Sequence, residues 1–212
     1  TGELYEATAI SAGKQHTCAL LEGGDVKCWG DGSKGALGQD STDSYGDTDD
    51  ASTERTMAFL DAIDLGGHKA IAVSAGYEHT CALLDNGDVR CWGENNNGQL
   101  GQDSQTDYGR TGTGTAASGP PKLMADLDAI DLGGHKAIAI SASRQHTCAL
   151  LENGDVRCWG DSAKGQLGQD SQTDFGKSLT TEPDDDGLPM ASLFAIDLGG
   201  HKAIAVSAGY EH

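Results

Sequence analysis

The chain has 212 residues, and its 33 acidic and 14 basic residues leave a formal net charge of −19. Such an acidic surface repels phosphate groups, so neither nucleic acid nor an anionic membrane is an expected partner. The sequence also lacks the apolar run of about 18 residues or more that a membrane-spanning helix needs. Its 31 glycines and its aromatic content of 5% favour short strands joined by turns over long helices.

One sequence pattern recurs along the whole chain. Its central part aligns without gaps in three copies, Ser11–Asp40, Ser74–Asp103 and Ser141–Asp170, and a partial fourth copy covers residues 207–212. We therefore interpret residues 1–212 as a single repeat array. Because the chain starts with Thr rather than Met and stops within a copy, we expect it to be a fragment or a processed piece of a longer protein.

Four strands are predicted in each copy, since a repeat of about 65 residues has room for four strands of about 5–6 residues and their loops. In chain order, the strands of the second copy are Leu60–Leu65, Lys69–Ala75, Glu78–Leu84 and Asp88–Gly93. Four-stranded sheets that repeat radially are the blades of a propeller. The predicted fold is therefore all-β, a β-propeller array of four-stranded blades with three complete repeats and a truncated fourth.

A short turn sets the register of the last two strands in each copy. Residues 85–87 read Asp-Asn-Gly, which fits a three-residue hairpin loop whose glycine adopts a left-handed conformation. The glycines predicted at this place are Gly24, Gly87 and Gly154. A loop of this length places the two cysteines of each copy directly opposite each other.

The six cysteines are therefore predicted to form one structural disulfide in each hairpin. Directly opposed residues of antiparallel strands have Cα atoms about 4.5–5.5 Å apart, which is within disulfide range. Reduced core thiols are one alternative, and metal ligation by His79 with its neighbouring cysteines is another. Disulfides favour an extracellular or periplasmic location over the cytoplasm or nucleus. The predicted pairs are Cys18 with Cys28, Cys81 with Cys91, and Cys148 with Cys158.

The second copy resembles the repeat of the regulator of chromosome condensation family. The resemblance lies in H-T-C-A-L-L-D-N-G-D-V-R-C-W-G-E-N-N-N-G-Q-L-G, with its Gly-x-x-His-Thr start and its Gly-Gln-Leu-Gly end, and it extends over nearly the whole chain. Family members typically build seven-bladed propellers, so the resemblance implies that further repeats of the same chain, or partners, complete the ring. The paired cysteines point to a secreted member.

Two repeated residue types are expected to pack between blades. The family motif carries its histidine as a structural feature, which implies that the histidine bonds a neighbouring loop. The tryptophan after the second cysteine points to the strand face opposite the cysteines, where packing is expected and ligand stacking is the alternative. These residues are His16, Trp29, His79, Trp92, His146 and Trp159.

The copies diverge most in acidic inter-blade loops at about residues 41–55, 104–121 and 171–189. Surface loops often carry recognition, so we expect the contact surface there. Their carboxylates are possible calcium ligands. However, the carboxylate spacing differs between copies and no EF-hand pattern occurs, which favours solvated loops. We predict no metal site and no cofactor.

The expected function is that of a non-catalytic scaffold that recognises a protein of unknown identity. Near-identical copies offer no asymmetric set of catalytic groups, so an enzyme is not expected. The resemblance implies one specific version, an inhibitor, because some secreted members inhibit bacterial enzymes. It also implies the alternative, a guanine-nucleotide exchange factor for a small GTPase, since the founding member has that activity. Chromatin binding is disfavoured by the net charge of −19.

Overall fold

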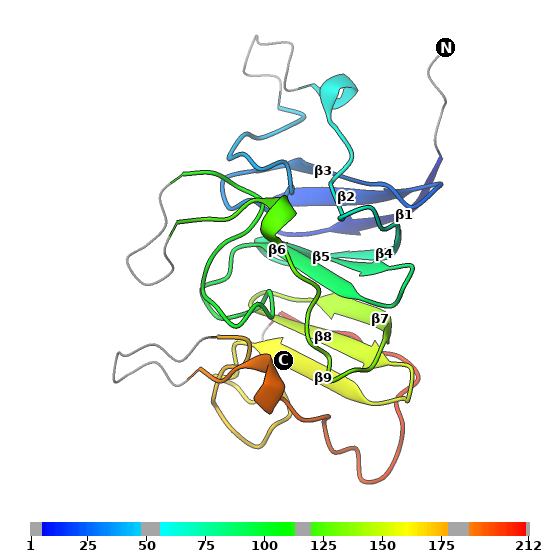
Figure 1. The fold of residues 1–212 in the computed structure, drawn as a ribbon, viewed down its shortest axis with the longest axis vertical. Helices are drawn as coiled ribbons and strands as arrows, with labels where there is room; N and C mark the ends of the chain where they lie inside the picture. Colours follow the sequence, from blue (N-terminus) through cyan, green and yellow to red (C-terminus); the bar gives the residue numbers. More distant parts are fainter. Residues whose placement is uncertain (1–5, 48–55, 113–119, 178–186, 211–212) are drawn as a thin grey trace.

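The computed structural model of the protein describes residues 6–47, 56–112, 120–177 and 187–210. Three antiparallel sheets, each built from one copy of the repeat, lie one above the other in this part of the chain (Figure 1). Each sheet has three strands, and the second strand pairs with both others. The stacking leaves the second sheet covered on both faces.

The three sheets have matching strands. The first contains β1 (Ala7–Ala12), β2 (His16–Leu21) and β3 (Val26–Gly30), the second β4 (Ala70–Ala75), β5 (His79–Leu84) and β6 (Val89–Gly93), and the third β7 (Ala137–Ala142), β8 (His146–Leu151) and β9 (Val156–Gly160). The 3₁₀ helices of the described residues are η2 (Met57–Phe59), η3 (Met124–Asp126) and η4 (Met190–Ser192). Within the same residues, no helix has the length and apolar character needed to cross a membrane.

The middle strand of each sheet carries the sequence His-Thr-Cys-Ala-Leu-Leu. Its last four residues are all apolar, so apolar and polar side chains do not alternate along the strand. β5 and β8 are buried along their whole length. A strand covered on both faces needs no polar side, which explains the lack of alternation. In β2, by contrast, Thr17 and Leu21 are half-buried, because the described residues place no sheet on its other side.

The hairpin turns have the left-handed backbone geometry for which glycine was predicted. Leu84 N–H donates to Asp88 O at 2.8 Å, and Cys81 lies directly opposite Cys91. This is the register expected from the turn, although β4, β5 and β6 each begin one residue later than predicted. The turn glycines have left-handed φ values of 83°, 80° and 81° at Gly24, Gly87 and Gly154.

The stretch predicted as the first strand of each copy is not a strand in the structure. Residues 60–65 run along the outer edge of β3, where Ile63 N–H donates to Val26 O at 2.9 Å. The carbonyl of Leu60 accepts from Lys27 Nζ at 2.6 Å. A β-ladder needs regularly repeated hydrogen bonds between backbone groups, whereas the Leu60 carbonyl accepts from a lysine side chain. The stretch therefore lies beside β3 without adding a strand to its sheet, and the sheets of the described residues have three strands rather than the predicted four.

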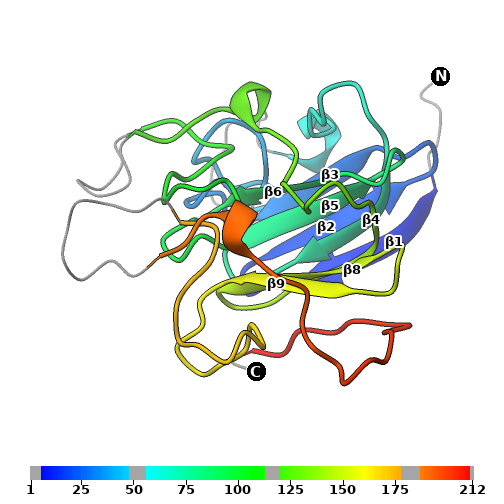
Figure 2. The same cartoon turned by 60° about the horizontal axis from the view of Figure 1, so that its bottom comes forward.

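Residues 203–208 of the fourth copy are not a strand either. Ala203 N–H donates to Gly154 O at 2.9 Å, and Ala208 N–H donates to Oγ of Ser141 at 2.9 Å. The same two bonds hold β4 and β7 against the sheets that precede them. The segment thus follows the path of a first strand, on the side of the third sheet that faces away from the first two (Figure 2).

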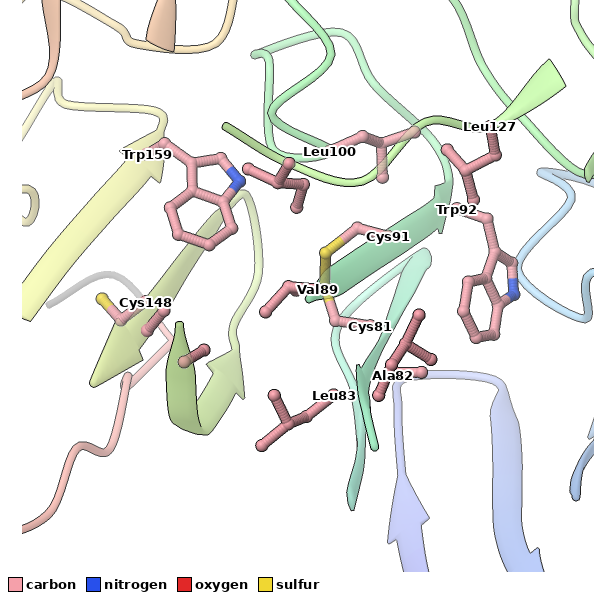
Figure 3. Close-up of a cluster of buried hydrophobic side chains, with 14 of the residues drawn as sticks. Cys81, Ala82, Leu83, Val89, Cys91, Trp92, Leu100, Leu127, Cys148 and Trp159 are labelled. Carbon is pink, nitrogen blue, oxygen red and sulfur yellow. A yellow bond between two sulfur atoms is a disulfide. The ribbon is translucent and has the colours of Figure 1, made fainter. Parts of the chain in front are cut away.

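The core lies between neighbouring sheets. Figure 3 shows the Cys81–Cys91 disulfide of the second sheet, with Trp92 facing the first copy and Trp159 facing the second. Both indoles are fully buried, and each satisfies its N–H with a carbonyl of the preceding copy. Trp92 and Trp159 therefore each pack in one interface between sheets, with the indole N–H hydrogen-bonded.

Candidate functional site

Each sheet holds one disulfide between its second and third strands. All six cysteines are buried, and none of those described is a free thiol. In this state they offer neither a nucleophile nor a metal ligand. The Cα atoms of the disulfide-bonded cysteines are 4.0 Å apart at Cys18–Cys28, 4.1 Å at Cys81–Cys91 and 4.1 Å at Cys148–Cys158.

The repeated histidine bonds the neighbouring sheet. His16 Nε2 lies 2.8 Å from Oγ1 of Thr80, and His79 Nε2 lies 3.0 Å from Oγ1 of Thr147. The Thr80 hydroxyl donates its only hydrogen to Ala36 O at 2.9 Å, so it must accept from His16, whose Nε2 carries the proton. Burial lowers the pKa of His16 to about 4 and that of His79 to about 3, so both are neutral at pH 7.

The third histidine and the first tryptophan have different surroundings from their equivalents. His146 is buried, and its Nδ1 lies 2.6 Å from Oγ of Ser143 in its own turn. Trp29 is half-buried and lines an open cavity with Tyr45 and Asp47. Trp92 and Trp159, by contrast, are fully buried, and each donates its indole N–H to a carbonyl of the preceding copy.

The acidic loops are described only in part. The ranges that lie outside the described residues are 48–55, 113–119 and 178–186. The aspartate before two of these loops is structural, because Asp40 Oδ1 accepts from Met124 N–H at 2.7 Å and Asp103 Oδ1 accepts from Met190 N–H at 2.6 Å. Where the chain is described, no three His, Cys, Asp or Glu side chains gather as a metal site.

A group of side chains that the sequence reasoning missed gathers at the turn between the first two strands of each sheet. Lys14, Tyr77 and Arg144 occupy this turn in the three sheets, and Tyr210 has the same position in the fourth copy. We call these four residues the first-turn cluster. Together with the alanines and small residues of the same turns, they line an open cavity of about 390 Å³.

Cations and aromatic rings alternate in the first-turn cluster. Lys14 Nζ lies 4.0 Å from the ring centroid of Tyr77. The guanidinium carbon of Arg144 lies 5.7 Å from the same centroid and 5.2 Å from that of Tyr210. These distances are within the range of favourable cation–π contacts. The two tyrosine rings meet edge to face with centroids 5.7 Å apart, and Lys14 Nζ also lies 3.1 Å from Glu78 Oε1.

Backbone hydrogen bonds between successive turns hold the cluster in place. Lys14 N–H donates to Gly76 O at 3.3 Å, and Tyr77 N–H donates to Ser143 O at 2.9 Å. A Cβ at Gly76 would lie 2.5 Å from Ser143 O, so glycine is what permits the second and third turns to approach this closely. The spacing of the cluster is thus set by the stacked main chains.

The cations make the surroundings of Tyr77 electropositive. The pKa of the Tyr77 phenol lies below its usual value, first because of its hydrogen bond with Lys14 and then because of its hydrogen bond with Tyr210, with Coulomb contributions from Lys14 and Arg144. The pKa of Lys14 is raised by its hydrogen bonds to Tyr77 and Glu78. The arrangement therefore suits an anionic group that approaches the cavity.

The sequence does contain a signal for this cluster. The turn reads Ser-Ala-Gly or Ser-Ala-Ser, followed by two variable residues and then His. The variable pairs are Lys-Gln, Tyr-Glu, Arg-Gln and Tyr-Glu in the four copies. Alternation of cation and tyrosine within an otherwise almost unchanged turn distinguishes these positions from the rest of the repeat.

Family models match the segments that form the three sheets. One model, described as the regulator of chromosome condensation (RCC1) repeat, matches residues 7–36, 70–99 and 137–166, and a second of the same description matches residues 86–150. The chain belongs to the regulator of chromosome condensation repeat family. In this family member, the matched segments contain the three disulfide hairpins and the first turns of the three sheets.

Curated relatives of this repeat chain are about a third identical to it over the aligned residues. The Ultraviolet-B receptor UVR8 of Arabidopsis thaliana is 32% identical over 160 residues, which cover 75% of this chain and 30% of the relative. The Regulator of chromosome condensation of Drosophila melanogaster is 32% identical over 167 residues, covering 79% and 26% respectively. The chain thus spans less than a third of the length of either protein.

Two solved structures have a similar fold. Prp20p of Saccharomyces cerevisiae, 20% identical, matches with a TM-score of 0.62 over 99% of this chain and 43% of its own. Human WBSCR16, 17% identical, matches with a TM-score of 0.60 over 92% of this chain and 40% of its own. The three stacked sheets are therefore an array of β-propeller type, like that of these proteins.

Proposed function

We propose that this repeat chain is a non-catalytic scaffold that recognises a protein partner through the first-turn cluster. One observation carries the proposal: in turns that are otherwise almost unchanged, the first residue of each variable pair lines one shared open cavity. Tyr and Arg, which make up three of the four residues of the cluster, are the types that often dominate binding energy at protein interfaces. The acidic loops, whose variable sequences predict a contact surface, are a second part of this proposal.

The frame behind the cluster supports a recognition role. A disulfide crosslinks each sheet, and buried His–Thr bonds join the sheets. Backbone bonds between turns then hold the cluster. A site whose groups are already ordered loses little conformational entropy when a partner binds.

Two features favour binding over catalysis. The cysteines of the described residues are disulfide-bonded, so they provide no thiol nucleophile. Lys14, the amine of the cluster, has a raised pKa, whereas an amine that acts as a nucleophile or base needs a lowered one. The cluster therefore offers charge and aromatic surface without an activated reacting group.

An extracellular or periplasmic location is part of the proposal. Disulfides persist in oxidising compartments, and this chain has one in each sheet. The test is a thiol count by alkylation and intact mass on denatured, unreduced protein purified from its native compartment. The expected result is no free thiol, and six free thiols would remove the support for export.

Quantitative affinity capture tests the recognition role. The wild-type chain and a variant that carries Tyr77→Ser with Arg144→Gln are immobilised, and proteins from the native surroundings are compared by mass spectrometry. We expect a specific set of proteins to bind the wild type and to be lost from the variant. The control is Lys136→Gln, whose amine pairs with Asp88 at 2.7 Å at the other end of β5.

The capture experiment can also contradict the proposal. If the cluster variant retains every protein that the wild type binds, the first-turn cluster is not the contact site. If Lys136→Gln loses the same proteins, the effect comes from total charge. Circular dichroism and the melting temperature of each variant establish that the fold is intact.

The alternative function is nucleotide exchange on a small GTPase. It is favoured by the similarity to the Regulator of chromosome condensation, and Prp20p is itself described by its binding properties to Gsp1p and histones. This similarity supports nucleotide exchange less strongly than the cavity supports recognition, because the chain spans only 26% and 43% of the lengths of these two proteins. A nucleotide-release assay against a panel of GTPases separates the two functions, since a scaffold leaves the release rate unchanged.

A further inference from the structure

We propose that the cavity of the first-turn cluster binds an acidic peptide segment, with carboxylates beside Lys14 and Arg144 and an apolar side chain on the alanines between them. This inference rests on the proposed recognition function and specifies the chemistry of the partner. It is carried by the charge of the lining, by the arrangement of the rings and by the shape of the cavity.

The lining of the cavity has the opposite sign to the rest of the protein. The chain has a net charge of −19 with only 14 basic residues, yet two of these, Lys14 and Arg144, line this cavity. No carboxylate is among its described lining residues, and Glu78 stands beside it, bonded to Lys14. A carboxylate that enters the cavity therefore meets cations at short range.

The tyrosines add directional groups to this charge. Tyr77 lies between both cations, and Tyr210 lies against Arg144 and the edge of the Tyr77 ring. The same cations lower the pKa of the Tyr77 phenol, which is how a positive local potential acts on an acidic group. Cations and phenol hydroxyls are all hydrogen-bond donors that suit carboxylate oxygens.

The wall of the cavity is apolar. One alanine from each turn lines it, and the members of this set are Ala12, Ala75, Ala142 and Ala208. A volume of about 390 Å³ exceeds what a carboxylate alone fills and lies within the usual range for bound ligands. The cavity therefore suits a peptide whose acidic residues flank an aromatic or aliphatic side chain.

The overall charge favours a short acidic segment over a nucleic acid. Charges separated by more than about 8 Å are largely screened at physiological salt, so the nearby cations dominate what a short ligand experiences. A nucleic acid follows the surface much further and meets the acidic remainder of a chain with a charge of −19. The cluster has too few cations to compensate for that repulsion.

Fluorescence anisotropy with three labelled probes tests the inference. The probes are the peptide Glu-Glu-Phe-Glu-Glu, its Gln-Gln-Phe-Gln-Gln counterpart and a single-stranded oligothymidylate. The wild-type chain is expected to bind the acidic peptide at least about tenfold more tightly than either other probe. Arg144→Gln and Lys14→Gln should each weaken this binding about tenfold, and Lys136→Gln should change it less than about twofold.

Each contrary result overturns the inference. Equal binding of the glutamine peptide would show that carboxylates are not recognised, and stronger binding of the oligonucleotide would show that phosphate is preferred. An equal loss in Lys136→Gln and Arg144→Gln would show that only total charge matters. If the acidic peptide fails to bind while capture of proteins still depends on Tyr77 and Arg144, the recognition function stands and only the partner chemistry is wrong.

Discussion

His79 donates from Nε2 to Oγ1 of Thr147 across the interface between the second and third sheets, over 3.0 Å. The Thr147 hydroxyl donates its own hydrogen to Gln99 O at 2.9 Å. It must therefore accept from His79, which fixes the histidine tautomer with the proton on Nε2. The same arrangement joins His16 to Thr80 one interface earlier. Two sheet interfaces therefore depend on buried neutral histidines.

Removal of the Thr147 hydroxyl should weaken the interface between the second and third sheets. Thr147→Val keeps the shape of a fully buried side chain but leaves the His79 N–H without an acceptor. We expect a loss of about 1–3 kcal/mol in the free energy of unfolding, measured by urea titration. Thr147→Ser retains the hydroxyl and is the control, so an equal loss in both variants would contradict a role for the hydrogen bond.

Acid should destabilise the protein through the buried histidines. The pKa of His16 is 6.5 when unperturbed and about 4 in the fold, so the unfolded chain binds a proton between these values that the folded chain does not. This stability is complete above pH 6.5 and is lost as the pH falls towards 4. From His16 alone we expect a decrease of about 3 kcal/mol in the free energy of unfolding between neutral pH and that point.

The variant His16→Gln isolates this contribution, because glutamine keeps an N–H donor for Thr80 but does not titrate in this range. Urea titrations across the pH range should give a smaller decrease for the variant than for the wild type. Parallel curves for the two proteins would mean that carboxylates, rather than His16, cause the acid sensitivity. Nearby Asp31 opposes the shift of His16 and is left unchanged in both proteins.

Reduction of the disulfides should lower stability without abolishing the register of the hairpins. Each bridge closes a short loop, so the expected contribution is about 2–3 kcal/mol per disulfide. The measurement compares urea titrations with and without dithiothreitol. A variant with Cys81→Ala and Cys91→Ala should lose less on reduction than the wild type, and unchanged midpoints in reduced wild type would contradict the expectation.

Asp103 should be replaceable by asparagine but not by alanine. It has a left-handed φ of 48°, and its carboxylate accepts from Met190 N–H at 2.6 Å. Asp103→Ala loses the acceptor and retains the strained conformation, so we expect a loss of about 1–3 kcal/mol in the free energy of unfolding. Asp103→Asn provides an oxygen and tolerates this φ, with an expected loss below about 1 kcal/mol. Similar losses in thermal melts of both variants would count against this role.

The sequence alone determined the features that depend on neighbours in the chain. The three-residue turn at Gly87 admits one pairing of its flanking strands, and that pairing places Cys81 opposite Cys91. The repeated residues of each copy predicted an all-β fold of short strands. The resemblance to the repeat family rests on the same residues. Local turn geometry and a side-chain period of two are enough for these predictions.

Only the tertiary structure decided which distant segments meet. The sequence predicts residues 60–65 as a strand of their own copy. In the structure they lie beside the free edge of β3, so the Ile63 N–H donates to the Val26 carbonyl of the preceding copy. Likewise, Lys14, Tyr77 and Arg144 are more than sixty residues apart from one another in sequence, and their grouping depends on how the sheets stack. A sequence repeat specifies each unit, but the contacts between units arise from the packing of whole faces, which no local pattern encodes.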